Sequence, residues 1–194
     1  MRNKNVRRAC GVFAKTIALT ALFVSLFEPG RGFSGETSLT EYQVKSLILV
    51  SLPKYVDWPS DAFANANTPI MIGVLGDSKF GAELAKTVEG QNVVGRPIIV
   101  RQIQTPEDSD KCHILFIGSS EKTHLADILG RIKAKPVLTV GETDQFLDQG
   151  GVINFVKKEG KIRLEINMDA ARLANLQISS RLLRVADVVK GKSK

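Results

Sequence analysis

The chain alternates between short, continuous apolar runs and stretches in which apolar residues recur at helical spacing. A short apolar run bounded by glycine or proline is typical of a strand that is covered on both faces. The pattern predicts such strands at residues 70–75, 97–103, 112–117 and 136–140, and a hairpin of two more at residues 152–156 and 161–166. It predicts helices at residues 39–58, with an interruption at Pro53, and at residues 79–88, 121–132, 143–148, 169–176 and 179–189.

Strands that alternate with helices predict βαβ units, in which successive strands run parallel and the helices cover the sheet. We therefore expect an α/β fold with three layers: a mostly parallel sheet covered by helices on both faces, with an antiparallel C-terminal hairpin at its edge. No internal repeat or low-complexity linker divides the sequence, so a single domain is expected over residues 35–194.

The first residues follow a different pattern. Five basic residues, the last of them Lys15, precede an uncharged apolar run at residues 16–27, and a turn-prone segment with small residues follows at residues 28–35. This order is typical of a secretory signal peptide. The apolar run is also shorter than the ~20 residues that a membrane-spanning helix needs. We expect residues 1–34 to be cleaved and the mature protein to be soluble in the periplasm; an uncleaved membrane anchor is the alternative.

Removal of this leader changes the electrostatic picture. The full chain has 27 basic and 20 acidic residues, which give a net charge of +7. Residues 1–34 hold six of the basic residues and one of the acidic ones, so the mature chain carries a net charge of only +2. Such a weak net charge does not support a nucleic-acid-binding function.

Cys112 is the single cysteine of the mature chain, because Cys10 leaves with the leader. Within an apolar run it is expected to be a buried core thiol; a chain-to-chain disulfide is the alternative. His113 follows it on a predicted strand, where adjacent side chains point to opposite faces and are poorly placed to share a metal. His124 is expected at the solvent-facing side of a helix. The sequence offers no grouped set of three or four metal ligands, so we expect neither a metal nor another cofactor.

No residue pattern in the chain predicts catalysis. Gly73, Gly76 and Gly81 stand where a strand enters a helix, but their spacing is not that of a nucleotide-binding loop. A nucleophile motif of the form G-x-S-x-G does not occur. Glu165 alternates with Arg163 along a predicted strand, which indicates an exposed or ion-paired face. The sequence therefore favours a protein that is not an enzyme.

Two segments are candidates for an interaction site. Tyr55, Trp58 and Pro59 form an aromatic corner that holds the only tryptophan of the chain, a residue type enriched at binding hot spots. The segment at residues 178–186 predicts an amphipathic helix. Its candidate contact residues are Ile178, Arg181, Leu182 and Leu183. Core packing is the alternative for both segments, and the helix could dock on its own sheet or on a second protomer.

The order and spacing of several segments resemble the YfiR family of small exported bacterial proteins. The most specific segments are GGVINF at residues 150–155, LEIN at 164–167 and ISSRLL at 178–183; the others are KYVDWP at 54–59, IGVLG at 72–76, HILFIG at 113–118 and LTVGE at 138–142. The resemblance covers residues 41–189, nearly all of the expected mature chain.

The resemblance implies a periplasmic α/β protein, often dimeric, that has no enzymatic activity. The family's named member binds the periplasmic part of a membrane-bound diguanylate cyclase and represses it, and an outer-membrane partner relieves the repression. This chain departs from that member because it lacks the paired cysteines that crosslink it. We expect a periplasmic regulator that restrains a membrane-anchored signalling partner, with an outer-membrane protein and a second copy of the chain as further candidate partners. A periplasmic small-ligand sensor or carrier is the alternative.

Overall fold

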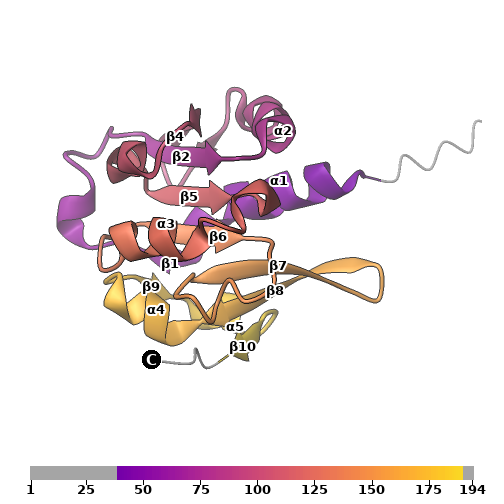
Figure 1. The fold of residues 1–194 in the computed structure, drawn as a ribbon. Helices are drawn as coiled ribbons and strands as arrows, with labels where there is room; N and C mark the ends of the chain where they lie inside the picture. Colours follow the sequence, from indigo (N-terminus) through magenta and orange to yellow (C-terminus); the bar gives the residue numbers. More distant parts are fainter. Residues whose placement is uncertain (1–38, 190–194) are drawn as a thin grey trace, which may run out of the picture. The chain divides into compact units, whose positions relative to one another are not determined.

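The computed structural model describes residues 39–189, so the predicted signal peptide and its cleavage site lie outside the described residues. An eight-stranded sheet forms the centre of this part of the chain (Figure 1). In their order across the sheet, the strands are β10 (Asp187–Val189), β8 (Lys161–Asn167), β7 (Ile153–Lys158), β6 (Leu138–Gly141), β5 (Ile114–Ile117), β2 (Ile70–Leu75), β4 (Arg96–Ile103) and β3 (Asn92–Val93). All neighbouring strands are parallel except β8 with β7 and β4 with β3, which confirms the predicted mostly parallel sheet.

Helices cover both faces of this sheet. They are α1 (Glu41–Ser51), α2 (Ser78–Val88), α3 (Leu125–Ile132), α4 (Met168–Leu173) and α5 (Ser180–Leu183), with the short 3₁₀ helices η1 (Leu52–Lys54), η2 (Ser60–Ala62), η3 (Pro106–Lys111) and η4 (Ser119–Glu121). On one face, Leu49 of α1, Phe80 of α2 and Leu182 of α5 share a core with the sheet. On the other face, Ile128 of α3 and Phe146 belong to a second core. The predicted three-layer arrangement is thus confirmed.

Local sequence signals set the ends of the helices on the first face. Thr40 and Gln43 form a capping box before α1, in which each backbone N–H donates to the other residue's side chain. Pro53 interrupts the helix as predicted, because α1 ends at Ser51 and the chain continues as η1. Asp77 caps α2 by accepting a hydrogen bond from the N–H of Phe80.

The helix predicted at residues 143–148 is wrong, because residues 144–150 form consecutive turns. Gln145 has a φ of +64°, which interrupts a right-handed helix. The ring of the buried residue Phe146 lies directly on two glycines. A Cβ added to Gly141 would come within 2.2 Å of this ring, and one added to Gly151 within 2.1 Å. The turn is therefore shaped by the ring that it inserts into the second core.

Two asparagines of the sheet form hydrogen bonds to the backbone of residues 143–150. The side-chain amide of Asn154 donates to the Thr143 carbonyl oxygen at 3.1 Å, and that of Asn167 donates to the Leu147 carbonyl oxygen at 2.9 Å. Both asparagines are buried, so these bonds satisfy polar groups that water does not reach. They fasten residues 143–150 to β7 and β8 without regular secondary structure.

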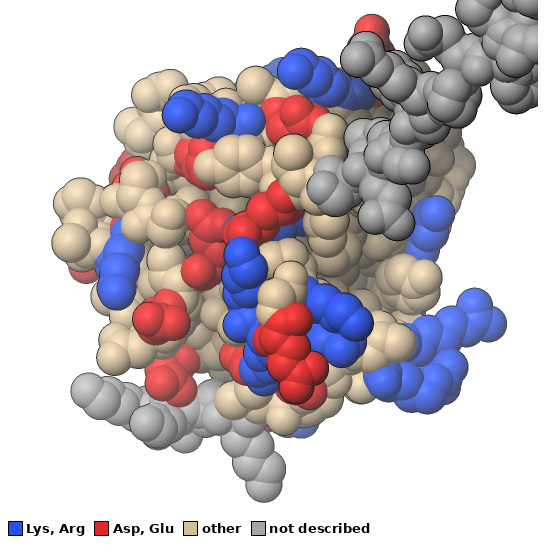
Figure 2. Space-filling model, turned by 90° about the vertical axis from the view of Figure 1, so that its right-hand side faces the viewer, with Lys and Arg blue, Asp and Glu red and all other residues tan. Residues whose placement is uncertain are grey.

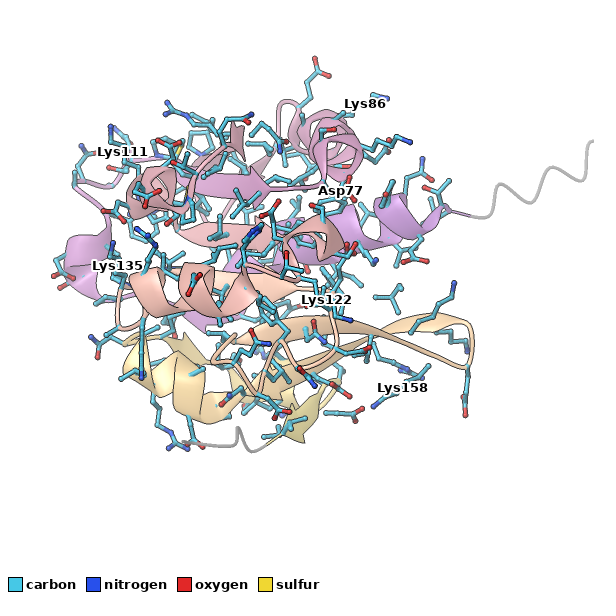
Figure 3. The ribbon with its side chains drawn as sticks, viewed as in Figure 1. Asp77, Lys86, Lys111, Lys122, Lys135 and Lys158 are labelled. Carbon is cyan, nitrogen blue, oxygen red and sulfur yellow. The ribbon has the colours of Figure 1, made fainter. Side chains whose placement is uncertain are left out.

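The helix predicted at residues 179–189 is correct only in its first part. Residues Ser180–Leu183 form α5, and the chain then extends into β10, which pairs parallel with β8. The hairpin of β7 and β8 is antiparallel as predicted, but β10 covers it, so the hairpin is not the edge of the sheet. Lys158, labelled on the hairpin in Figure 3, joins the three strands because its ammonium lies 2.9 Å from Glu165 and 2.8 Å from Asp187.

Other element boundaries differ more modestly from the prediction. The helix predicted at residues 121–132 begins at Leu125, after η4, and the one predicted at residues 169–176 ends at Leu173. The sequence pattern gives no sign of β3 or of two further short strands, β1 (Val56–Asp57) and β9 (Gln177–Ile178). The last two form a separate two-stranded sheet.

Cys112 is buried in the second core, as predicted. Its sulfur atom is close to Gly73, where an added Cβ would come within 2.7 Å of it. Burial raises the pKa of the Cys112 thiol to about 11. The thiol is therefore almost wholly protonated at the pH of most experiments.

We expect Cys112 in the native mature chain to react with a thiol reagent far more slowly than a free thiol does at pH 8. The reactive thiolate is then only about one part in a thousand, and the sulfur is also shielded from the reagent. Absorbance of the released chromophore, measured with and without denaturant, tests this expectation. Rapid labelling of the native protein, or a crosslinked dimer on a non-reducing gel, would contradict it.

Candidate interaction surface

The two segments that the sequence analysis singles out lie side by side. Strand β1 pairs antiparallel with β9, so that Val56 lies opposite Ile178. The N–H of Ser179 also donates to the Tyr55 carbonyl oxygen at 2.8 Å. We call this pair of strands the β1–β9 ribbon. It joins an aromatic corner near the start of the described residues to the segment before β10 (Figure 1).

An apolar hollow of about 490 Å³ lies next to Tyr55, the residue that precedes the ribbon strand β1. It is lined by Ile48, Ser51, Leu52, Tyr55, Leu164, Arg181, Leu182, Arg184 and Val185. Leu182 is only 4% exposed and belongs to the core, whereas Val185 is 69% exposed. Arg181 and Arg184 are exposed beside this apolar surface. The hollow therefore combines an apolar floor with a basic rim.

A second hollow, of about 400 Å³, also borders the ribbon. It is lined by Asp57, Trp58, Pro59, Arg172, Asn175, Leu176 and Gln177. Trp58 is half-buried, and its indole N–H has no hydrogen-bond partner among the described residues. This nitrogen is itself buried, so its missing hydrogen bond is a cost to the closed corner.

The predicted contact residues differ in how far they are exposed to solvent. Tyr55, Trp58, Pro59, Ile178 and Leu183 are half-buried, Arg181 is exposed, and Leu182 is buried. Ile178 lies on the ribbon, and all the others except Leu183 line one of the two hollows. Leu183 packs against the core. Leu182 is least accessible, so changes there act first on core packing.

Sequence reasoning missed the contribution of α1 to this surface. Ile48 and Ser51 line the first hollow, and Leu47 of the same helix is 49% exposed. The available signal was that apolar residues run around the circumference of α1 instead of along one stripe. A helix of this kind has apolar side chains left over once its core-facing side is buried.

Phe63 supports Trp58 from the inside. The two rings meet edge to face with their centroids 6.2 Å apart. Phe63 in turn stacks on the imidazole of His113 at 4.2 Å, with 9° between the ring planes. The guanidinium of Arg96 lies 4.1 Å above the centroid of the Phe63 ring. The position of Trp58 therefore depends on a stack that is anchored in β4 and next to β5.

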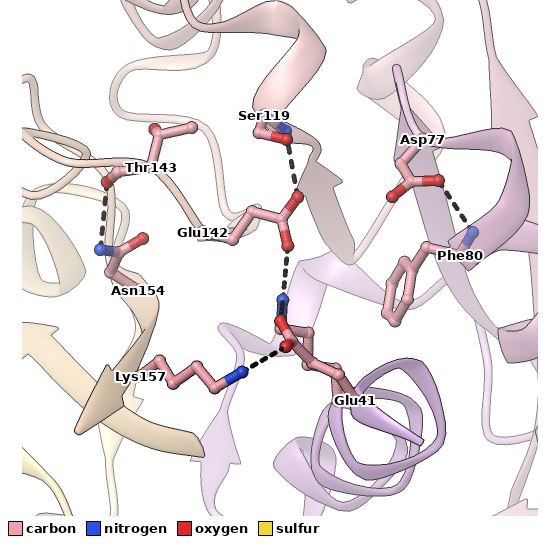
Figure 4. A network of polar contacts seen from close by, with 9 residues as sticks. Glu41, Asp77, Phe80, Ser119, Glu142, Thr143, Asn154 and Lys157 are labelled. Carbon is pink, nitrogen blue, oxygen red and sulfur yellow. Dashed lines mark hydrogen bonds and ion pairs between the residues drawn. The ribbon is translucent and has the colours of Figure 1, made fainter. Parts of the chain in front are cut away.

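A charged cluster, which sequence reasoning also missed, lies at the carboxyl ends of the parallel strands. The ammonium of Lys45 is 2.6 Å from Glu41 and 2.7 Å from Glu142. Glu142 also accepts a hydrogen bond from the Ser119 N–H at 3.1 Å, and Glu41 pairs with Lys157 at 3.3 Å (Figure 4). Figure 2 shows basic and acidic side chains interleaved on this face.

The paired charges of this cluster indicate a structural role. Burial acts to lower the pKa of Lys45, but hydrogen bonds to Glu142 and Glu41 outweigh it, and the pKa lies above its usual value. The bond from Lys45 is also the main cause that lowers the pKa of Glu41. The charges are thus retained at neutral pH and fasten α1 to the ends of the strands. The spacing of Glu41 and Lys45 was a readable signal, since such pairs meet on a helix surface.

The two histidines lie as the sequence predicts. The side chains of Cys112 and His113 point to opposite faces, and the side chain of His124 is 70% exposed. Within residues 39–189, no three His, Cys, Asp or Glu side chains are grouped so that they could hold a metal ion. In the same part of the chain, no helix has both the length and the apolar character needed to cross a membrane.

Comparisons with known proteins point to one family. The model of a family described as YfiR/HmsC-like matches residues 42–187, which is most of the chain. No curated protein matches the sequence significantly. The fold is similar to that of an ABC domain in complex with L-Trp from Streptococcus pneumoniae (12% identity, TM-score 0.50) and of a conserved domain protein from Vibrio cholerae (12% identity, TM-score 0.53). The matches cover 76% and 79% of this chain but only 60% and 61% of those structures, and at this identity they show the fold alone.

Proposed function

Because the chain belongs to the YfiR/HmsC-like family, we propose that it is a periplasmic regulator without enzymatic activity, which binds and restrains a membrane-anchored signalling protein. A diguanylate cyclase is the partner that family membership favours. The predicted signal peptide at residues 1–34 supports a periplasmic location. An outer-membrane protein that relieves the restraint, and a second copy of the chain, are further proposed partners.

The observation that carries the proposal is the β1–β9 ribbon. It joins the aromatic corner to the segment at residues 177–178. Tyr55 and Arg181 line an apolar hollow, and Trp58 and Gln177 line a second, mixed polar and apolar one. Half-buried aromatic residues that border hollows, with arginine at the rim, are the residue types that dominate binding energy at protein interfaces. We propose that this surface is where the partner binds.

Val185→Asp tests the surface with little risk to the fold, because Val185 is 69% exposed. We expect the variant to lose at least about tenfold in affinity for the partner, because a carboxylate enters the contact and must be desolvated. Its melting temperature should stay within about 2 °C of the parent protein. Val94→Asp is the matched control, since Val94 is 61% exposed and lies at the opposite edge of the sheet.

The measurement is recovery of the partner from a detergent-solubilised envelope by the tagged mature chain, with cyclic-di-GMP measured in cells that carry each variant. Val185→Asp should raise cyclic-di-GMP towards the level of a gene deletion, and Val94→Asp should not. Equal recovery by both variants would reject this surface. An unchanged cyclic-di-GMP level in the deletion strain would reject the cyclase as partner.

A further inference from the structure

His113 is held in its neutral form by both of its ring nitrogens. Its Nδ1 accepts a hydrogen bond from the Met71 N–H at 3.0 Å. The single ring proton is therefore on Nε2, which donates to the Ala62 carbonyl oxygen at 3.1 Å. The residue is only 7% exposed. A second proton on Nδ1 would meet the Met71 N–H head-on, so the ring cannot take up a proton without moving.

The surroundings of His113 also disfavour its cation. Arg96 and His113 each lie about 4 Å from the Phe63 centroid, so they occupy opposite faces of that ring. A protonated imidazole would place a second positive charge against the stack. Burial is the main cause that holds the pKa of His113 below 6.5. Its bond to Ala62 acts in the opposite direction, and the Arg96 charge adds to the lowering.

The other charged groups near this stack do not compensate. Asp61 of η2 is exposed, as is Lys111 of η3. Asp110 of η3 pairs with Lys135 (Figure 3 labels both lysines). No carboxylate among the described residues forms an ion pair or a hydrogen bond with the His113 ring. His113 can therefore take up a proton only if the site opens.

The segment that would open, residues 59–68, directly follows Trp58 of the aromatic corner. His113 holds Ala62, and Arg96 donates to the carbonyl oxygens of Asn65, Ala66 and Thr68 at 2.8, 2.9 and 2.8 Å. Phe63 lies between these two anchors and supports Trp58. When the His113 bond is lost, Phe63 loses its stacking partner and the support of Trp58 weakens.

We propose that His113 is an acid-sensitive latch, which holds residues 59–68 closed when neutral and releases Phe63 and Trp58 when protonated. The consequence for partner binding rests on the proposed function, whereas the opening itself does not. In the open site the ring meets water, where the pKa of histidine is about 6.5. The closed site is thus fully favoured above that pH and is progressively lost as the pH falls below it.

Trp58 is the only tryptophan, so its fluorescence reports this corner alone. For the mature chain, we expect a reversible change in Trp58 emission below pH 6.5, while far-UV circular dichroism stays constant. The chain has one other histidine, so His124→Gln is a matched control that should keep the change. His113→Gln should abolish it. Constant emission from pH 8 to pH 4.5, or the same change in His113→Gln, would overturn the latch.

A second variant covers the case in which His113→Gln does not fold. Phe63→Leu removes the ring between His113 and Trp58. Titration of His113 by NMR should then show its midpoint rising towards about 6.5, the pKa of histidine in water, and Trp58 emission should no longer follow the pH. Emission that still follows the His113 titration in Phe63→Leu would overturn the proposed route.

The link to partner binding is measured separately. Recovery of the partner by the mature chain should fall between pH 7.5 and pH 5.5, by at most about tenfold, the largest change that one proton bound at a pKa of about 6.5 can give at pH 5.5. His113→Gln or Phe63→Leu should reduce this dependence. Equal recovery at both pH values, with a normal fluorescence change, would overturn the regulatory role of the latch. Failure to recover a partner at either pH would count against the proposed function and leave the fluorescence result standing.

Discussion

Phe146→Ala is expected to lower the free energy of unfolding by about 3–5 kcal/mol, the range for removing a fully buried aromatic ring. The ring is 0% exposed and rests on Gly141 and Gly151, so its loss leaves a cavity that neither glycine can fill. Chemical denaturation monitored by circular dichroism measures the change. A loss below about 1 kcal/mol would mean that the turn collapses onto the sheet and that the ring is not its main support.

The two glycines supply a control for this prediction. Gly151→Ala puts a methyl group within 2.1 Å of the Phe146 ring, so we expect it to be destabilising by about 3 kcal/mol. In the Phe146→Ala background the same change should be nearly neutral, because the obstructing ring is gone. Gly130 lies in α3, and a Cβ added there would meet no other side chain or distant backbone atom within 4 Å. Gly130→Ala should therefore stabilise the protein by about 0.5–1 kcal/mol, because alanine favours the helix more than glycine does.

Lys45→Met is expected to lower the free energy of unfolding by about 3–5 kcal/mol at neutral pH, the usual result of removing one partner of a buried ion pair. Glu142, whose side chain is 11% exposed, would keep its charge without the ammonium that lies 2.7 Å away. The loss should shrink at acid pH, because the bond from Lys45 lowers the pKa of Glu41 and this contribution to stability disappears as the pH falls through that lowered pKa. Denaturation at several pH values measures both effects.

Lys157→Met is the matched control for the charged cluster, since the side chain of Lys157 is 63% exposed and pairs with the same Glu41. It should cost less than about 1 kcal/mol. Lys45→Met combined with Glu142→Gln should recover part of the stability, because no buried charge is then left unpaired. If Lys45→Met costs as little as Lys157→Met, below about 1 kcal/mol, the ion pairs of the cluster are screened by water.

The central strands could be predicted because their signal is local. Residues 70–75 form a continuous apolar run that ends at Gly76, and β2 has these bounds. The turn at residues 143–150 could not be predicted in the same way. Its shape depends on Phe146 packing against Gly141 and Gly151, and on amides from β7 and β8, none of which leaves a periodic trace in the turn itself.

The two segments of the candidate surface could be predicted from the sequence, but not that they lie side by side. The aromatic corner and the segment at residues 178–186 each carry residue types that favour binding. Their adjacency depends on a pairing of only two residues per strand, Val56 and Asp57 with Ile178 and Gln177. The spacing of Leu182, Leu183 and Val185 fits a helix, so the sequence pattern did not predict that the chain changes from helix to strand after α5. It is fixed by pairing with β8, which a local pattern does not encode.

The β1–β9 ribbon has a consequence for the order of folding. Its two strands come from near the two ends of the described residues, so the loop that must close between them contains most of the chain. Contacts of such long sequence separation form slowly, because the entropy of loop closure is lost before the contact contributes. A chain that is truncated before Gln177, or still incompletely folded, would have no ribbon to offer a partner. Binding competence would therefore be acquired last, and only by a full-length molecule.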